Sequence, residues 1–153
     1  MINTLIADPF RDLVAPETLE RAALAVLEKH ALEVEHDLTI VIEDDARLQE
    51  LNQAYLEIDA PTDVLSFPSG GGEVDPESGH PYLGDVIISY PRALEQSQAA
   101  GHTVGDELQL LVVHGVLHLL GYDHAEPEEK EAMWRVQADI LAALGVRINR
   151  LPE

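Results

Sequence analysis

The chain has 153 residues and a mass of 16.8 kDa, which fits one ordinary domain and excludes two. Hydrophobic residues make up 46% of it and charged residues 25%, a soluble globular composition that excludes wholesale disorder. Cysteine is absent, which excludes disulfides, thiolate metal sites and cysteine nucleophiles. The N-terminus lacks a signal-peptide pattern, and no segment approaches the roughly 18 apolar residues of a membrane span. We therefore expect a cytoplasmic protein that does not bind membranes.

The net charge of −20 is large and unevenly distributed. Between Leu48 and Glu129, Arg92 is the single basic residue against fifteen acidic ones, a net charge of −14. Such a charge argues against nonspecific electrostatic binding to nucleic acid or to anionic membranes. Two interpretations remain: a solvated acidic surface, or an acidic centre that binds cations or a partner with a basic face.

The pattern of apolar and polar residues predicts four strands, at 2–7, 37–43, 63–67 and 83–89. It predicts helices at 16–30, 45–55 and 90–100 and, after the Pro127 helix start, at 128–144. A further helix begins at a Thr103 cap and is apolar nearly all round over 108–120, so we expect it to be buried at the centre. The segment 69–81 is rich in glycine, proline and acids and is predicted to be a loop.

This order of elements predicts an α/β (α+β) fold. We expect a single small domain over residues 1–153, with a mixed sheet of about four strands packed with about five helices. The first strand is expected at an edge of the sheet. The central buried helix carries two histidines, His114 and His118, that are candidate metal ligands.

Three histidines lie close together in the sequence, at positions 114, 118 and 124. His114 and His118 are one helical turn apart, so their side chains share a face about 6 Å apart and can bind one ion. Gly121 follows, where a left-handed residue can reverse the chain and return His124 to the same ion. Three imidazoles without a thiolate favour Zn²⁺ over Ni²⁺, Mn²⁺ or Fe²⁺, and three protein ligands leave one position open. We therefore predict about one zinc ion per chain.

Core or capping histidines are the alternative interpretation of this cluster. A single histidine on an apolar helix is usually one of these. Two buried histidines that face each other without an ion, however, would have to be desolvated together. The spacing therefore favours a metal site.

The same offsets occur in the metzincin protease pattern, where a glutamate beside the first histidine is the general base. Gly115 occupies that position here, which weakens a metallopeptidase function. A base must then come from another carboxylate, and Asp85, Asp106 and Asp123 are the candidates. Asp123 adjoins a predicted ligand and could instead orient an imidazole. The predicted catalytic residues are Asp85 and Asp123.

Three blocks of sequence carry a more specific pattern. Residues 61–68 are P-T-D-V-L-S-F-P, residues 83–89 are L-G-D-V-I-I-S, and residues 114–124 are H-G-V-L-H-L-L-G-Y-D-H. In this order they resemble the YbeY family, bacterial endoribonucleases that mature ribosomal RNA. The resemblance spans essentially the whole chain. It implies a small α/β fold with a metal at the end of a cleft and zinc on His114, His118 and His124.

The resemblance also implies a function. It points to a zinc-dependent, single-strand-specific endoribonuclease in small-subunit rRNA maturation and ribosome quality control. The implied partners are ribosomal RNA and the small ribosomal subunit, reached through a basic ribosomal protein, and an assembly GTPase. The chain departs from the family where Leu56 follows Tyr55, because the family commonly has arginine there. The alternative is a non-catalytic ribosome-assembly factor whose zinc only stabilises the fold.

Overall fold

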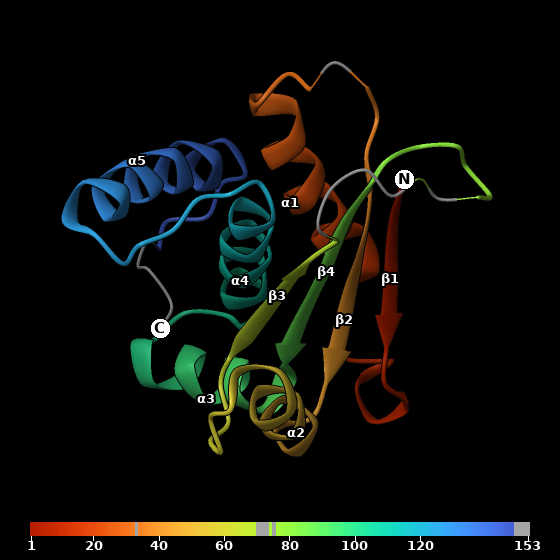
Figure 1. The fold of residues 1–153 in the computed structure, drawn as a ribbon. Helices are drawn as coiled ribbons and strands as arrows, with labels where there is room; N and C mark the ends of the chain where they lie inside the picture. The colour runs from red at the N-terminus through yellow and green to blue at the C-terminus, as the bar shows by residue number, and fades with distance from the viewer. Residues whose placement is uncertain (33, 70–73, 75, 149–153) are drawn as a thin grey trace.

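The computed structural model describes residues 1–32, 34–69, 74 and 76–148, and within them it contains a four-stranded sheet and five α-helices (Figure 1). The strands are β1 (Ile2–Ile6), β2 (Asp37–Glu43), β3 (Val64–Pro68) and β4 (Tyr82–Ser89). The helices are α1 (Pro16–Lys29), α2 (Asp45–Leu56), α3 (Tyr90–Ala100), α4 (Val104–Leu119) and α5 (Pro127–Ala143), with a short 3-10 turn over Asp8–Phe10. The predicted single small domain, mixed sheet and helix number are therefore confirmed.

The order of strands in the sheet is β1-β2-β4-β3. β1, β2 and β4 run parallel, whereas β3 pairs antiparallel with β4, with Ser66 opposite Val86. β1 lies at one edge, as predicted, and β3 lies at the other. The sheet therefore ends beside α4 in a strand of reversed direction.

Side chains alternate between the two faces of the sheet, as the two-residue period of a strand requires. Leu38 and Ile40 of β2 and Val86 and Ile88 of β4 face the main core, which α1 and α4 cover. The opposite face carries a smaller cluster in which α2 packs its leucines. This cluster consists of Leu48, Leu51 and Leu65, with Phe67 and Ile87 against it.

Helix α4 is the buried centre of the molecule. Twelve of its sixteen residues are buried, and it lies between the sheet and α5 (Figure 1). It begins as predicted, with the Thr103 hydroxyl accepting from the Asp106 N–H at 3.1 Å. Being apolar nearly all round, it can pack on several sides at once. It is therefore held rigidly enough to position functional side chains.

Small differences from the expected boundaries have local causes. Pro68 continues β3 instead of closing it, because an edge strand tolerates a residue without an N–H. Part of the predicted 69–81 loop, at residues 70–73 and 75, lies outside the described residues. The last five residues of the predicted domain, 149–153, lie outside them as well. Among the residues that are described, no helix combines the length and apolarity needed to cross a bilayer.

Candidate metal centre

Three imidazoles converge at the C-terminal end of α4. One ring nitrogen from each of His114, His118 and His124 lies within 4.8 Å of the other two. The Nε2 atoms of His114 and His118 are 3.0 Å apart, close to the roughly 3.3 Å that two imidazole ligands on a tetrahedral zinc ion would have. This group could hold a metal ion.

The first two histidines are placed by the packing of α4 on the sheet. Between them, Gly115 lies so close to β4 that a Cβ atom would be 2.5 Å from the Val86 Cγ1 atom. Its carbonyl also accepts a hydrogen bond from the Ser66 hydroxyl of β3 at 3.0 Å. A glutamate at this position would force α4 and β4 apart, so the close packing here does not suit the metzincin type of general base.

The third histidine is returned by the turn after α4. Gly121 has a φ of 102°, a left-handed conformation that favours glycine. The Gly121 N–H donates to the His118 carbonyl, and the Tyr122 N–H donates to the Leu117 carbonyl. The Tyr122 hydroxyl lies 2.9 Å from Nε2 of His30, the residue that follows α1, which ties the turn to the end of that helix. The loop that carries His124 is thus fixed at two points.

Gln137 of α5 is a functional residue that the sequence reasoning missed. It is fully buried, and its Oε1 atom lies 3.1 Å from His114 Nδ1. Because an amide oxygen only accepts, this contact places the His114 proton on Nδ1 and leaves the Nε2 lone pair toward the other histidines. The available signal was a glutamine on the buried face of an amphipathic helix, with Met133, Ile140 and Leu141.

The environment of His118 favours its neutral form. Burial lowers its pKa below the ordinary 6.5, and the neighbouring His124 lowers it further. A hydrogen bond to the Tyr122 backbone and the charge of Asp123 act in the opposite direction. The neutral imidazole is the form that binds a metal.

The structure brings Asp123 to the histidines but does not bring Asp85 there. Asp123 is exposed, and its carboxylate accepts from the His124 N–H at 2.7 Å. Val86 faces α4, so the preceding Asp85 lies on the opposite face of the sheet, where it accepts a hydrogen bond from the Tyr82 hydroxyl. Asp106 lies in the first turn of α4, about 12 Å along the helix axis from His114.

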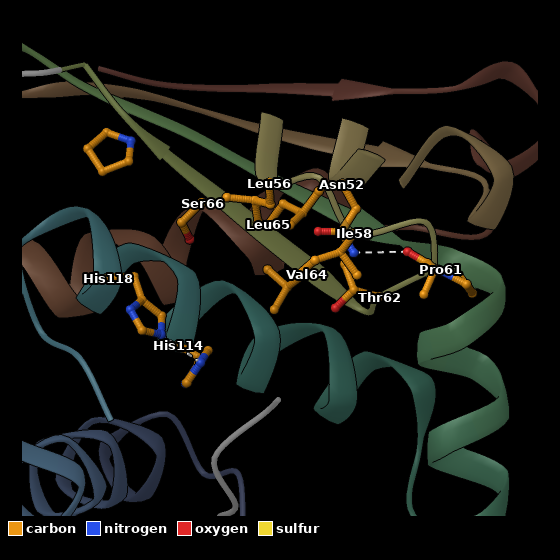
Figure 2. Close-up of a pocket in the computed structure, with 12 residues that line it drawn as sticks. Asn52, Leu56, Ile58, Pro61, Thr62, Val64, Leu65, Ser66, His114 and His118 are labelled. Atoms are coloured by element: carbon orange, nitrogen blue, oxygen red, sulfur yellow. Dashed lines mark hydrogen bonds between the residues drawn. The ribbon is translucent and has the colours of Figure 1, made fainter. Parts of the chain in front are cut away.

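A cleft of about 520 Å³ opens beside the histidines, between α4 and β3 (Figure 2). None of the described residues that line it is charged, and Leu56 and Ile58 on its α2 side are about half exposed. Asn52 holds that side in place, because its amide donates to the Ala60 carbonyl at 2.9 Å. The lining residues are Asn52, Leu56, Ile58, Ala60, Pro61, Thr62, Val64, Leu65, Ser66, Pro68, His114 and His118.

Comparison with known proteins assigns the chain to the family that residues 114–124 resemble. The sequence model described as "Endoribonuclease YbeY" matches residues 11–145. The chain belongs to the YbeY family. An endoribonuclease YbeY of Mycobacterium sp. (strain KMS) is 42% identical over 133 residues, covering 84% of this chain and 75% of that protein. That of Dehalococcoides mccartyi is 42% identical over 149 residues, covering 91% and 92%. The predicted resemblance and the prediction of an enzyme are thus confirmed.

A solved structure supports the fold. The solution structure of a Thermotoga maritima protein superposes with a TM-score of 0.57 and 24% sequence identity, covering 94% of this chain and 91% of that one. At this identity the likeness bears on the fold alone. The α/β architecture described above is therefore shared with an experimentally determined structure.

Proposed function

We propose that the chain is a zinc-dependent, single-strand-specific endoribonuclease that acts on small-subunit ribosomal RNA in maturation and quality control. The observation that carries this proposal is the convergence of three imidazoles beside an open cleft. Membership of the YbeY family supports the class of reaction. An all-histidine set without a fourth protein ligand among the described residues is typical of catalytic rather than structural zinc.

The protein side chains would hold the ion in a defined way. His114, His118 and His124 would bind it, with Gln137 keeping the His114 ring in the required tautomer. When bound, zinc supplies Lewis acidity toward a phosphate ester. We assign proton transfer to Asp123 rather than to Asp85, because its exposed carboxylate adjoins His124.

The cleft is suited to bind single-stranded RNA. Its lining offers apolar side chains and a few neutral polar groups, such as Asn52, Thr62 and Ser66. These groups can contact bases and ribose, which are accessible in single strands and hidden in a duplex. With no cation in the described lining, phosphate binding falls to the metal centre and to a partner. A basic protein of the small subunit would fit the acidic surface, and an assembly GTPase is a further partner in this proposal.

The test is cleavage of a single-stranded RNA by purified, zinc-loaded protein. His114→Ala should abolish cleavage and lower zinc content, while circular dichroism shows the fold retained. His36→Ala is the control, because the partly exposed His36 ring is not one of the three clustered imidazoles and its Nδ1 atom lies 2.9 Å from the Val34 carbonyl oxygen, two residues away. Equal cleavage by wild type and His114→Ala would identify a contaminating nuclease and refute the assignment.

The second candidate is a non-catalytic, zinc-stabilised assembly factor, favoured by the uncharged cleft and by Leu56. It gives a different result in the same assay. Protein with about one zinc ion per chain would bind the small subunit without cleaving RNA at any salt concentration, and zinc removal would lower only the melting temperature.

A further inference from the structure

The outer edge of β3 presents unpaired backbone groups to the cleft. The Ser89 N–H donates to the Asp63 carbonyl and the Ser69 N–H to the Leu83 carbonyl, so odd-numbered residues along this strand pair with β4. In an antiparallel ladder the intervening residues point their backbone groups the other way. Val64, Ser66 and Pro68 therefore direct theirs away from β4, and all three line the cleft. Among the described residues, no other strand pairs with this edge.

The backbone groups that point away from β4 are spaced so that another β-strand could pair with them. The N–H groups of Val64 and Ser66 and the carbonyls of Val64, Ser66 and Pro68 repeat every second residue. This spacing matches that of an extended polypeptide added to a sheet edge. Because the strand lies beside a cleft of about 520 Å³, there is room for an added chain (Figure 2).

The surroundings determine the chemistry of that chain. On the α2 side the cleft wall is apolar, with Leu56 and Ile58 about half exposed. All the lining residues fall within the Leu48–Glu129 stretch, whose net charge is −14, and Glu57 and Asp59 are exposed beside Ile58. A peptide with aliphatic side chains at alternate positions and basic flanks complements both features.

We infer that this cleft binds an extended basic segment of a partner protein as a fifth strand on β3. The backbone of Val64 and Ser66 provides the affinity, and the apolar wall selects the side chains. A bound peptide covers the approach to His114 and His118 from the cleft, so it competes with any ligand that enters there. The inference does not depend on RNA cleavage.

Amide hydrogen exchange, measured by NMR on the zinc-loaded protein, tests which β3 amides bond to the added peptide. In the free protein we expect slow exchange at Leu65 and Phe67, which pair with β4, and fast exchange at Val64 and Ser66. The probe is a peptide of alternating valine and threonine with two lysines at each end. At saturation it should slow Val64 and Ser66 by about tenfold or more, with little change at Leu65 and Phe67.

Two matched comparisons isolate the backbone bonds. The same peptide N-methylated at alternate residues keeps its side chains and charges but should bind about tenfold more weakly. Ser66→Pro should weaken binding of the unmodified peptide to a similar extent, whereas Ser66→Ala should not. Both variants lose the hydroxyl bond to Gly115, but only proline also removes the N–H and places its ring carbons on that edge.

Three results would overturn the inference. The first is equal affinity of the methylated and unmethylated peptides, a comparison that uses only the wild-type protein. The second is unchanged exchange at Val64 and Ser66 under saturating peptide. The third is protection of these amides by oligouridylate and not by the peptide, which would assign the edge to nucleic acid.

Discussion

Gln137 connects the last helix to the metal centre through a buried contact with His114. Its oxygen accepts from Nδ1, so the ring is oriented and its tautomer is selected before any ion binds. This arrangement makes α5 part of the site, although none of the predicted metal ligands lies on that helix.

Replacing Gln137 by methionine removes the acceptor while keeping the side chain similar in volume. We expect zinc affinity to fall about 10- to 100-fold, measured by competition with a chromophoric chelator. Gln137→Glu, which keeps an acceptor, should restore most of it. Gln109→Met is the matched control, because Gln109 is also buried but bonds to the Gly105 carbonyl. Similar losses in both methionine variants would indicate a general packing effect and contradict the positioning role.

Gly115 sets the distance between α4 and the sheet. In Gly115→Ala the new methyl group meets the stiff Val86 side chain at 2.5 Å, so the helix must shift and the free energy of unfolding should fall by about 2 kcal/mol. Gly105→Ala, in the same helix, has only the Thr103 hydroxyl within reach, at 3.9 Å, and should be neutral or stabilising. Urea unfolding at neutral pH measures both. An unchanged midpoint for Gly115→Ala would show that the contact can relax.

At the scale of elements, α2 and α3 are joined where each begins. Asp45, in the first turn of α2, accepts two hydrogen bonds at 3.1 Å from Arg92 of α3 and one at 3.0 Å from the Ser89 hydroxyl. The bonds from Arg92 are the main reason that the pKa of Asp45 lies below its ordinary 3.8. Arg92, the single cation between Leu48 and Glu129, is thus already engaged in a structural pair.

This pair predicts a specific dependence of stability on pH. The folded-state pKa of Asp45 lies below the unfolded value, so the unfolded state takes up the proton first as the pH falls below about 4. The contribution of the pair is therefore present above that pH and is lost on acidification. Arg92→Met should lower the free energy of unfolding by about 1 kcal/mol at pH 7, allowing for partial solvent screening, and by much less near pH 3.

The surface pair of Arg47 with Glu50 provides the comparison for this effect. Both side chains are more than half exposed, so Arg47→Met should change stability little at either pH. Urea midpoints at the two pH values give the measurement. An equal loss at pH 7 and near pH 3 for Arg92→Met would show that its effect does not depend on the charge of Asp45.

At the scale of the whole molecule, the charge and the cleft act together. A chain of net charge −20 with an uncharged cleft releases few counterions when RNA binds, because no cluster of lysine or arginine among the described residues lines the site. We expect the affinity of the isolated chain for a short single-stranded RNA to change little between about 50 and 300 mM salt.

Fluorescence anisotropy at several salt concentrations measures this dependence. Binding through phosphate contacts would instead weaken steeply, with a slope of about −0.7 per neutralised phosphate on a plot of log affinity against log salt. Such a slope would show that cations elsewhere on the chain contact the RNA. Adding a basic partner protein that leaves the cleft open should restore a steep dependence, since its cations would then contribute.

Local patterns were enough to predict most elements and the three histidines. The two-residue alternation in β2 and β4 and the apolar run of α4 require no knowledge of distant residues, and neither does the four-residue spacing of His114 and His118. These features depend on the geometry of one strand or one helical turn, which is determined by residues close together in the sequence.

The tertiary structure decided what depends on the arrangement of elements. Alternation along β4 shows that Asp85 and Val86 face opposite ways, but only the packing of Gly115 on Val86 shows that Asp85 faces away from α4. The Gln137 contact joins residues 23 positions apart, and the open edge of β3 follows from its reversed direction at the end of the sheet. Neighbours brought together by packing leave no periodic trace in a single sequence, because the contact is made in space rather than along the chain.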